Sequence, residues 1–204
     1  MNLYTSDMHL FHPNVTGEGI NFDGRPFATL EEMHSSIRNN WNAKVTNADH
    51  VYILGDMTWK VNDDSIAFVS TLKGNKHLIL GNHDSVKDLR YSNLFADIVD
   101  YKKIRDKAFG INFNVIASHF PMMFWDGQRR FNNYDDKRVP KSVHLYGHVH
   151  NSIEERIFQK FITELNTEYD YDCVAANVGS MIHNYTPMTL EELLGNEFKK
   201  RYNL

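Results

Sequence analysis

The most informative stretch of the chain reads Lys76-His77-Leu78-Ile79-Leu80-Gly81-Asn82-His83-Asp84. A short, mostly apolar run is followed at once by glycine and three polar side chains. An apolar run of this length bounded by turn residues is typical of a buried strand, and glycine allows the chain to turn sharply after it. The stretch therefore predicts a strand over residues 76–80 that delivers polar side chains at its carboxyl end.

Four other apolar runs end in the same way. They cover residues 2–6, 51–54, 112–117 and 143–146, and they lead into Asp7-Met8-His9, Gly55-Asp56, Ser118-His119 and Gly147-His148-Val149-His150. Ligand sites of α/β proteins form where the carboxyl ends of neighbouring strands meet. We therefore expect these polar side chains to share one site.

The segments between the strands have helical patterns. Apolar residues three and four apart predict helices over residues 29–45 and 63–72, and Thr189 with Glu192 forms a capping box that opens a final helix toward Lys199. A sixth apolar run covers residues 174–178. Strands that alternate with helices predict an α/β fold, and the absence of repeats or linkers predicts one domain over residues 1–204.

Composition narrows the class of protein. The 204 residues are 42% hydrophobic and 24% charged, as in ordinary globular proteins. The single cysteine, Cys173, excludes an internal disulfide framework, and no secretory signal or membrane span is recognisable, so we expect a cytoplasmic protein. A net charge of −4 argues against nucleic acid or an anionic membrane as partner.

Histidine and carboxylate, rather than thiolate, dominate the strand ends. Two divalent cations about 3.5–4 Å apart can clamp a phosphoryl group and activate water. Such a pair needs a carboxylate that can bridge and several neutral nitrogen or oxygen donors, and these are available in Asp7, His9, Asp56, Asn82, His119, His148 and His150. This pattern predicts a catalytic metal centre.

The ordered motifs D-x-H, G-D, G-N-H-[ED], H and G-H-x-H resemble those of the calcineurin-like metallophosphoesterase superfamily. All five occur here in order between Asp7 and His150, and the flanking blocks resemble a compact bacterial and phage branch of it. The resemblance implies a four-layer α-β-β-α sandwich of two mixed sheets flanked by helices. The metal site would lie at the carboxyl ends of the strands.

The resemblance also implies a role for each residue. One metal would be held by Asp7, His9, Asp56 and His150, and the other by Asp56, Asn82, His119 and His148. A hydroxide between the two metals would attack phosphorus in line. His83 would act as the catalytic residue that stabilises negative charge or protonates the leaving oxygen.

One position departs from the family pattern. Many members have a further aspartate after the second motif that orients the histidine of the third motif, and Trp59 stands at that place here. Either Asp84 or a backbone carbonyl would then have to orient His83.

Three further residues are candidates for substrate binding. His12 either reaches the phosphate or caps the turn before Pro13. The irregular stretch Phe124–Lys141 lies between two ligand motifs and is expected to be a loop at the rim of the site. There Arg129 and Arg130 either grip an anionic substrate group or belong to a solvated loop.

The sequence thus predicts a metal-dependent phosphoesterase that hydrolyses a small phosphate ester, with a phosphodiester preferred over a phosphomonoester. The metals are expected to be two Mn²⁺ ions, with Fe, Co²⁺, Ni²⁺ and Zn²⁺ as alternatives because nitrogen and oxygen donors accept all of them. A nuclease and a metal-binding module without turnover are the alternative functions. A homodimer would be compatible with the sequence.

Overall fold

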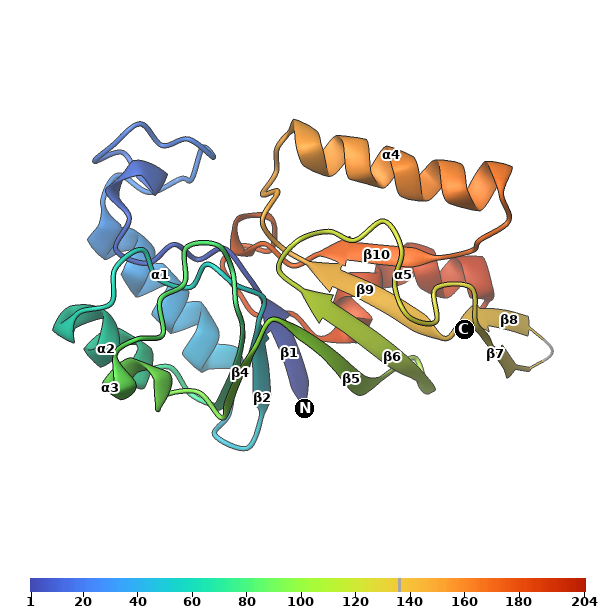
Figure 1. Ribbon diagram of the computed structural model, residues 1–204, viewed down its shortest axis with the longest axis horizontal. Helices are drawn as coiled ribbons and strands as arrows, with labels where there is room; N and C mark the ends of the chain where they lie inside the picture. Colours follow the sequence, from blue (N-terminus) through green and yellow to red (C-terminus); the bar gives the residue numbers. More distant parts are fainter. Residues whose placement is uncertain (136) are drawn as a thin grey trace.

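The computed structural model describes residues 1–135 and 137–204, and its strands form two four-stranded sheets (Figure 1). The first sheet contains β1 (Asn2–Thr5), β2 (His50–Ile53), β3 (Asn75–Ile79) and β4 (Asp97–Val99) in the order β1-β2-β3-β4. Every pair in this sheet is parallel, with Leu3 opposite Val51 and Ile53 opposite Leu78. The carboxyl ends of these strands therefore lie at one edge.

The second sheet is mixed. It contains β5 (Tyr101–Ala108), β6 (Ile111–Ser118), β9 (Ser142–Tyr146) and β10 (Val174–Asn177) in the order β10-β9-β6-β5. The β5–β6 pair is antiparallel, whereas β6, β9 and β10 run parallel to one another. A separate hairpin is formed by β7 (Phe131–Tyr134) and β8 (Lys137–Pro140).

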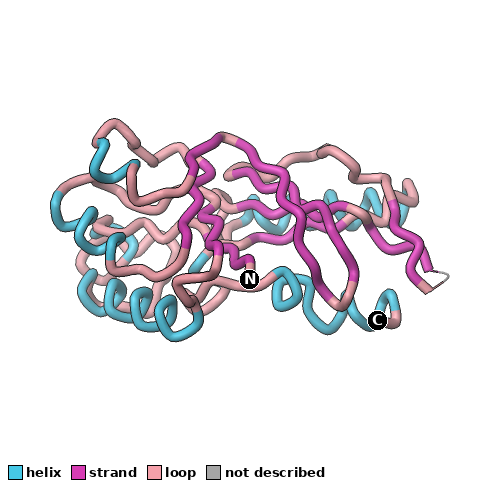
Figure 2. The backbone as a smooth tube through the Cα atoms, turned by 90° about the horizontal axis from the view of Figure 1, so that it is seen from below, coloured by secondary structure: helices cyan, strands magenta, loops and turns pink. Residues whose placement is uncertain are grey.

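Helices cover the outer faces of the two sheets, so that the strands run through the middle of the molecule (Figure 2). The first sheet carries α1 (Leu30–Lys44), α2 (Asp63–Ser70) and the short α3 (Leu89–Ser92), and the second carries α4 (Ile153–Glu168). The helix α5 (Leu190–Tyr202) completes the interior, and 3₁₀ turns occur at Pro13–Val15 and Ser180–Ile182. The capping boxes at Thr29 and Thr189 are present.

Three groups of buried side chains match these layers. The first, with Leu3 and Val51, joins the parallel sheet to α1 and α2. The second lies between the two sheets. It includes Leu54, which directly follows β2, and Val115 of β6, and it extends to α5. The third packs α4 on the outer face of the mixed sheet. The two sheets therefore share one buried interior, which fixes the carboxyl ends of β1 and β6 relative to each other.

The predicted α/β class and its two sheets between helical layers are confirmed. In the described residues the first sheet is parallel throughout, and only the second is mixed. The hairpin β7–β8 was not predicted, because the stretch Phe124–Lys141 was expected to be a loop. Among the described residues, no helix is both long and apolar enough to cross a membrane.

Candidate metal centre

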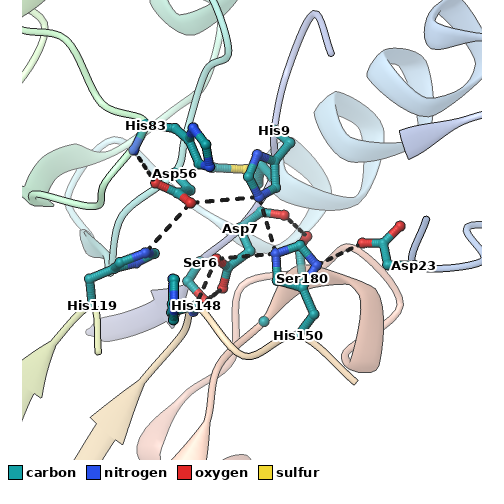
Figure 3. Close-up of polar contacts among 12 residues, drawn as sticks. Ser6, Asp7, His9, Asp23, Asp56, His83, His119, His148, His150 and Ser180 are labelled. Carbon is teal, nitrogen blue, oxygen red and sulfur yellow. Dashed lines mark hydrogen bonds and ion pairs between the residues drawn. The ribbon is translucent and has the colours of Figure 1, made fainter. Parts of the chain in front are cut away.

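The carboxyl ends of β1, β6 and β9, together with the turns after β2 and β3, converge on one place in the molecule. Figure 3 shows side chains from these different segments pointing toward one another. The structure brings together all seven side chains that the sequence analysis selected as ligands: Asp7, His9, Asp56, Asn82, His119, His148 and His150. They form two adjacent groups.

The first group consists of Asp7, His9 and His150, which offer ligand atoms within 4.8 Å of one another. The Nε2 atoms of His9 and His150 face each other at 3.1 Å, and His150 Nε2 lies 3.7 Å from Asp7 Oδ1. Two imidazole nitrogens at this separation suit a shared cation, because ligand atoms about 2.0–2.1 Å from a metal are themselves about 3 Å apart.

The second group consists of Asp56, His119 and His148, again within 4.8 Å. His119 Nε2 lies 3.5 Å from Asp56 Oδ2 and 3.0 Å from the Oδ1 atom of Asn82. The other nitrogen of His119, Nδ1, donates to the carbonyl oxygen of Leu54 at 2.7 Å. This hydrogen bond leaves the lone pair of Nε2 free to face the group.

Asp56 connects the two groups. Its Oδ2 atom lies 3.7 Å from His9 Nε2 and 3.5 Å from His119 Nε2, so one carboxylate oxygen faces a histidine of each group. Its Oδ1 atom accepts a hydrogen bond from the backbone N–H of His83 at 2.9 Å. The carboxylate is thereby oriented as a bridge between two cations would require.

The backbone is unusual at these residues. Asp7, His9, Asp56, His148 and His150 all have positive φ, between 47° and 68°. Residues other than glycine seldom adopt this left-handed conformation, and such strain persists only where the surrounding structure fixes it. Five of the seven converging residues share it, which marks this place as a functional site.

The glycines before the ligands provide space. A Cβ atom on Gly81 would lie 2.3 Å from Asp56 Oδ1, and one on Gly147 would lie 2.4 Å from Asp7 Oδ2. Only Gly55 of the three has a positive φ, of 88°. We expected all three to permit a sharp turn, but at Gly81 and Gly147 the requirement is close approach of a carboxylate.

The electrostatics of the site fit bound cations. Asp7 is completely buried, and its burial raises the pKa of its carboxyl group. Burial alone would also raise the pKa of Asp56, but the neighbouring His119 imidazole, the His83 backbone N–H and His9 outweigh it and lower this pKa to about 2. Burial lowers the pKa of His9 to about 3, so its ring stays neutral, and its Nδ1 atom has no hydrogen-bond partner among the described residues. Buried carboxylates with neutral imidazoles form a donor set for divalent metals.

Comparison with known proteins assigns this arrangement. The family model described as calcineurin-like phosphoesterase matches residues 3–148, which include six of the seven converging side chains. The chain belongs to the calcineurin-like phosphoesterase family. It is therefore a metal-dependent phosphoesterase, and its two groups of donors correspond to the two divalent metals that are typical of the family.

Similar proteins cover most of the chain. The gene 66 protein of Mycobacterium phage D29 is 28% identical over 165 residues, which are 74% of this chain and 78% of the relative. The gene 66 protein of Mycobacterium phage L5 is 26% identical over 168 residues, covering 72% and 76%. The crystal structure of a protein of unknown function from Aquifex aeolicus superimposes with a TM-score of 0.62, at 25% identity, over 98% of both chains.

A buried ion pair supports the first group of donors. The carboxylate of Asp23 accepts a hydrogen bond from His150 Nδ1 at 3.0 Å (Figure 3). Arg25 binds this carboxylate and also donates to the carbonyl oxygens of Asp7 and Met8, at 2.8 and 2.7 Å. A carboxylate behind a metal-binding histidine fixes its tautomer and orientation. Asp23 was not predicted as a functional residue, because it lies in an irregular segment that follows no strand.

His83 stands at the rim of the centre and is exposed. The centroid of its ring lies 5.6 Å from that of the His9 ring and 4.9 Å from that of the Trp59 indole. Asp84 does not orient it. The Asp84 carboxylate accepts hydrogen bonds from the backbone N–H groups of Asp56, Met57 and Gly81, and so holds the two ligand turns together.

His12 caps a turn, which was one of the two roles expected for it. Its Nδ1 atom accepts a hydrogen bond from the backbone N–H of Asn14 at 3.2 Å, at the start of the 3₁₀ turn Pro13–Val15. Its ring stacks on Trp59 with centroids 4.0 Å apart. Burial lowers the pKa of His12, which favours the neutral imidazole.

The two arginines selected from the sequence lie elsewhere. Arg130 borders a hollow with Asn112, at the start of β6, whereas His119 follows the end of that strand. Asn112 and His119 are seven residues apart, which corresponds to about 23 Å of extended chain. The guanidinium of Arg129 lies over the ring of Tyr171, 4.7 Å from its centroid. The expectation that the stretch with both arginines rims the metal centre is corrected, because the segment just before β7 lies toward the other end of the sheet, where the Lys141 N–H donates to the Arg130 carbonyl oxygen.

Proposed function

We propose that the protein hydrolyses phosphodiesters at a centre of two divalent cations. One cation would be bound by Asp7, His9, Asp56 and His150, and the other by Asp56, Asn82, His119 and His148. The observation that carries the proposal is the position of Asp56 Oδ2, which lies within 3.7 Å of a histidine Nε2 atom from each group. Two bound dications would polarise the phosphoryl group and activate the attacking water.

His83 is the residue best placed to act on the leaving group. It is exposed at the rim, and its own backbone N–H is anchored on the bridging carboxylate of Asp56. An imidazole in this position stabilises the charge that develops in the transition state or donates a proton to the leaving oxygen. The stacked rings of Trp59 and His12 limit the movement of the imidazole on one side.

The surroundings of the centre favour a diester over a monoester. In the part of the chain that the structure describes, Arg25 is the one arginine or lysine side chain hydrogen-bonded to a residue of the centre, and it is buried against backbone carbonyls. A monoester carries a second negative charge, and Arg25, whose guanidinium already donates to the carbonyl oxygens of Asp7 and Met8, is not available to neutralise it. Exposed aromatic rings stand beside the histidines instead: Phe22 next to His150, and Phe120 next to His148. These rings suit an organic substituent on phosphorus.

Mn²⁺ is the metal that we propose for the centre. The donors are imidazole nitrogens and carboxylate or amide oxygens, with no thiolate, and such a set accepts Mn²⁺ as well as Fe, Co²⁺, Ni²⁺ and Zn²⁺. What supports Mn²⁺ is that three of the seven donors, Asp7, Asp56 and Asn82, offer oxygen, which suits this ion, beside four imidazole nitrogens that it also accepts.

The test compares a diester with a monoester. Metal-free protein is reconstituted with Mn²⁺, and hydrolysis of bis-p-nitrophenyl phosphate and p-nitrophenyl phosphate is followed at equal concentrations. We expect the diester to be cleaved faster, Asp56→Asn to abolish cleavage, and His83→Ala to lower kcat by about 10²–10⁴-fold. Asp126→Asn, which removes an exposed carboxylate paired with Lys103, is the matched control. Equal rates for wild type and Asp56→Asn, or a faster monoester, would contradict the proposal.

A further inference from the structure

A second site lies outside the metal centre, on the outer face of the mixed sheet. It is a hollow of about 680 Å³ beside β5, β6 and the hairpin β7–β8. Its lining consists of four cationic residues, three asparagines and one phenylalanine: Lys103, Arg105, Arg130, Lys141, Asn112, Asn114, Asn132 and Phe113. Figure 1 shows the hairpin at the end of the sheet away from the arrowheads of β6 and β9.

The sheet itself places the cations on one face. In the antiparallel β5–β6 pair, Arg105 lies opposite Asn114, and Lys103 lies opposite Ile116. Side chains directly opposite one another project from the same face of a sheet. The alternate residues Ile104 and Val115 belong to the buried interior on the other face. Lys103 and Arg105 therefore project outward, two residues apart, at a spacing of about 6.8 Å.

Backbone hydrogen bonds extend this row sideways. The N–H of Asn114 donates to the carbonyl oxygen of Lys141 at 2.9 Å. The N–H of Lys141 in turn donates to the carbonyl oxygen of Arg130 at 2.8 Å. Arg130, Lys141, Asn114 and Arg105 thus lie side by side across the sheet. Neighbouring strands are about 4.8 Å apart, so the positive charges are separated by only one or two strand spacings.

The positive charge of this hollow is only partly balanced, because Asp126, just outside it, pairs with Lys103 and lies near Arg130. No carboxylate is found in its lining as far as the structure describes the chain, and Lys103 alone of the four forms an ion pair, with Asp126. Like charges this close repel one another, and the chain as a whole carries a net charge of −4. A concentration of cations on an acidic protein therefore indicates an anionic ligand.

We propose that this hollow binds the phosphate backbone of an extended single strand of nucleic acid. Grooves that hold single strands without sequence preference carry cations along the path of the backbone. The two-residue spacing along β5 is comparable to the distance between successive phosphates of an extended strand. The neighbouring asparagine amides add uncharged hydrogen-bond donors. The net charge of the whole chain is −4 and argues against nucleic acid as a partner, but this hollow is locally positive because four cationic residues line it.

The proposal is independent of the proposed hydrolysis and is tested without turnover. Binding of a fluorescein-labelled oligothymidylate is measured by anisotropy in EDTA, with the Asp56→Asn protein, as a function of salt concentration. Three free cations on three phosphates predict a slope of log K against log salt of about −2, because each phosphate of a single strand contributes about −0.7. Arg105→Gln combined with Lys141→Gln should reduce the slope to about −0.7 and weaken binding at low salt by about tenfold.

A matched variant controls for net charge. Lys199→Gln combined with Lys200→Gln removes the same charge from α5, which packs against the other face of the sheet. This control should bind as the parent protein does. Equal weakening by both double variants would show a general charge effect and would overturn the proposal. Polyglutamate that competes as well as unlabelled oligothymidylate would overturn the assignment to phosphate.

Discussion

The substitution Asp23→Asn tests how the chain supports its metal ligands. Asp23 accepts the hydrogen bond from His150 Nδ1 at 3.0 Å, and Arg25 holds its carboxylate in place at 3.0 Å. Asparagine keeps the size of the side chain but removes the negative charge that orients the imidazole and raises its basicity. Loss of such a carboxylate typically lowers metal affinity 10–100-fold, which corresponds to about 1.4–2.8 kcal/mol.

The effect should be confined to one of the two metals. His119, in the other group, donates its Nδ1 proton to the carbonyl oxygen of Leu54 and does not depend on Asp23. Calorimetric titration of metal-free protein with Mn²⁺ should therefore show one weakened step and one unchanged step. Asp126→Asn is the control with the same change of charge. If both steps of Asp23→Asn stay within twofold of wild type, the supporting role of Asp23 is refuted.

Three further perturbations test separate parts of the structure. Arg25→Met should lower the free energy of unfolding by about 3–5 kcal/mol in denaturant titrations, since it leaves the Asp23 carboxylate and two carbonyl oxygens buried without their donor; a loss below 1 kcal/mol would contradict this. Gly147→Ala should weaken Mn²⁺ binding at least about tenfold, because the new Cβ would lie 2.4 Å from Asp7 Oδ2, whereas Gly195→Ala, in open space but at a φ of 67°, should strain α5 without weakening Mn²⁺ binding. Burial lowers the pKa of His144 to about 4, so the unfolded chain takes up a proton near pH 6.5 that the folded chain refuses. The free energy of unfolding is therefore unaffected by His144 above pH 6.5, and the protonation of His144 in the unfolded chain lowers it by about 3 kcal/mol as the pH drops to 4. The metal-free His144→Gln protein should lose this part of the slope in denaturant titrations at pH 7, 6 and 5, and an unchanged slope would refute the assignment.

Most of the centre could be predicted from the sequence because its ligands follow apolar strands directly. In a parallel arrangement, the carboxyl ends of such strands meet, so a local pattern at Asp7, Asp56 or His148 has a three-dimensional consequence. The supporting residues lack this signal. Asp23 and Arg25 act from an irregular segment, and their contacts with His150 and Asp7 span long distances in sequence.

The elements that were missed had weaker or conflicting patterns. The strand β5 alternates exposed and buried residues, but Lys102, Lys103, Arg105 and Lys107 make it look like a solvated segment. The helix α4 has an N-cap at Ser152 and a buried stripe of Phe158, Ile162 and Leu165, so helical spacing would have found it. The position of Arg130 could not be predicted, because it depends on pairing of the segment before β7 with Lys141.

Anomalous diffraction from crystals soaked in Mn²⁺ tests the central claim most directly. The account predicts two anomalous peaks per chain, about 3.5–4 Å apart. The Oδ2 atom of Asp56 should lie between them, with His9 and His150 on one side and His119 and His148 on the other. A single peak, or two peaks without Asp56 between them, would contradict a bridged centre.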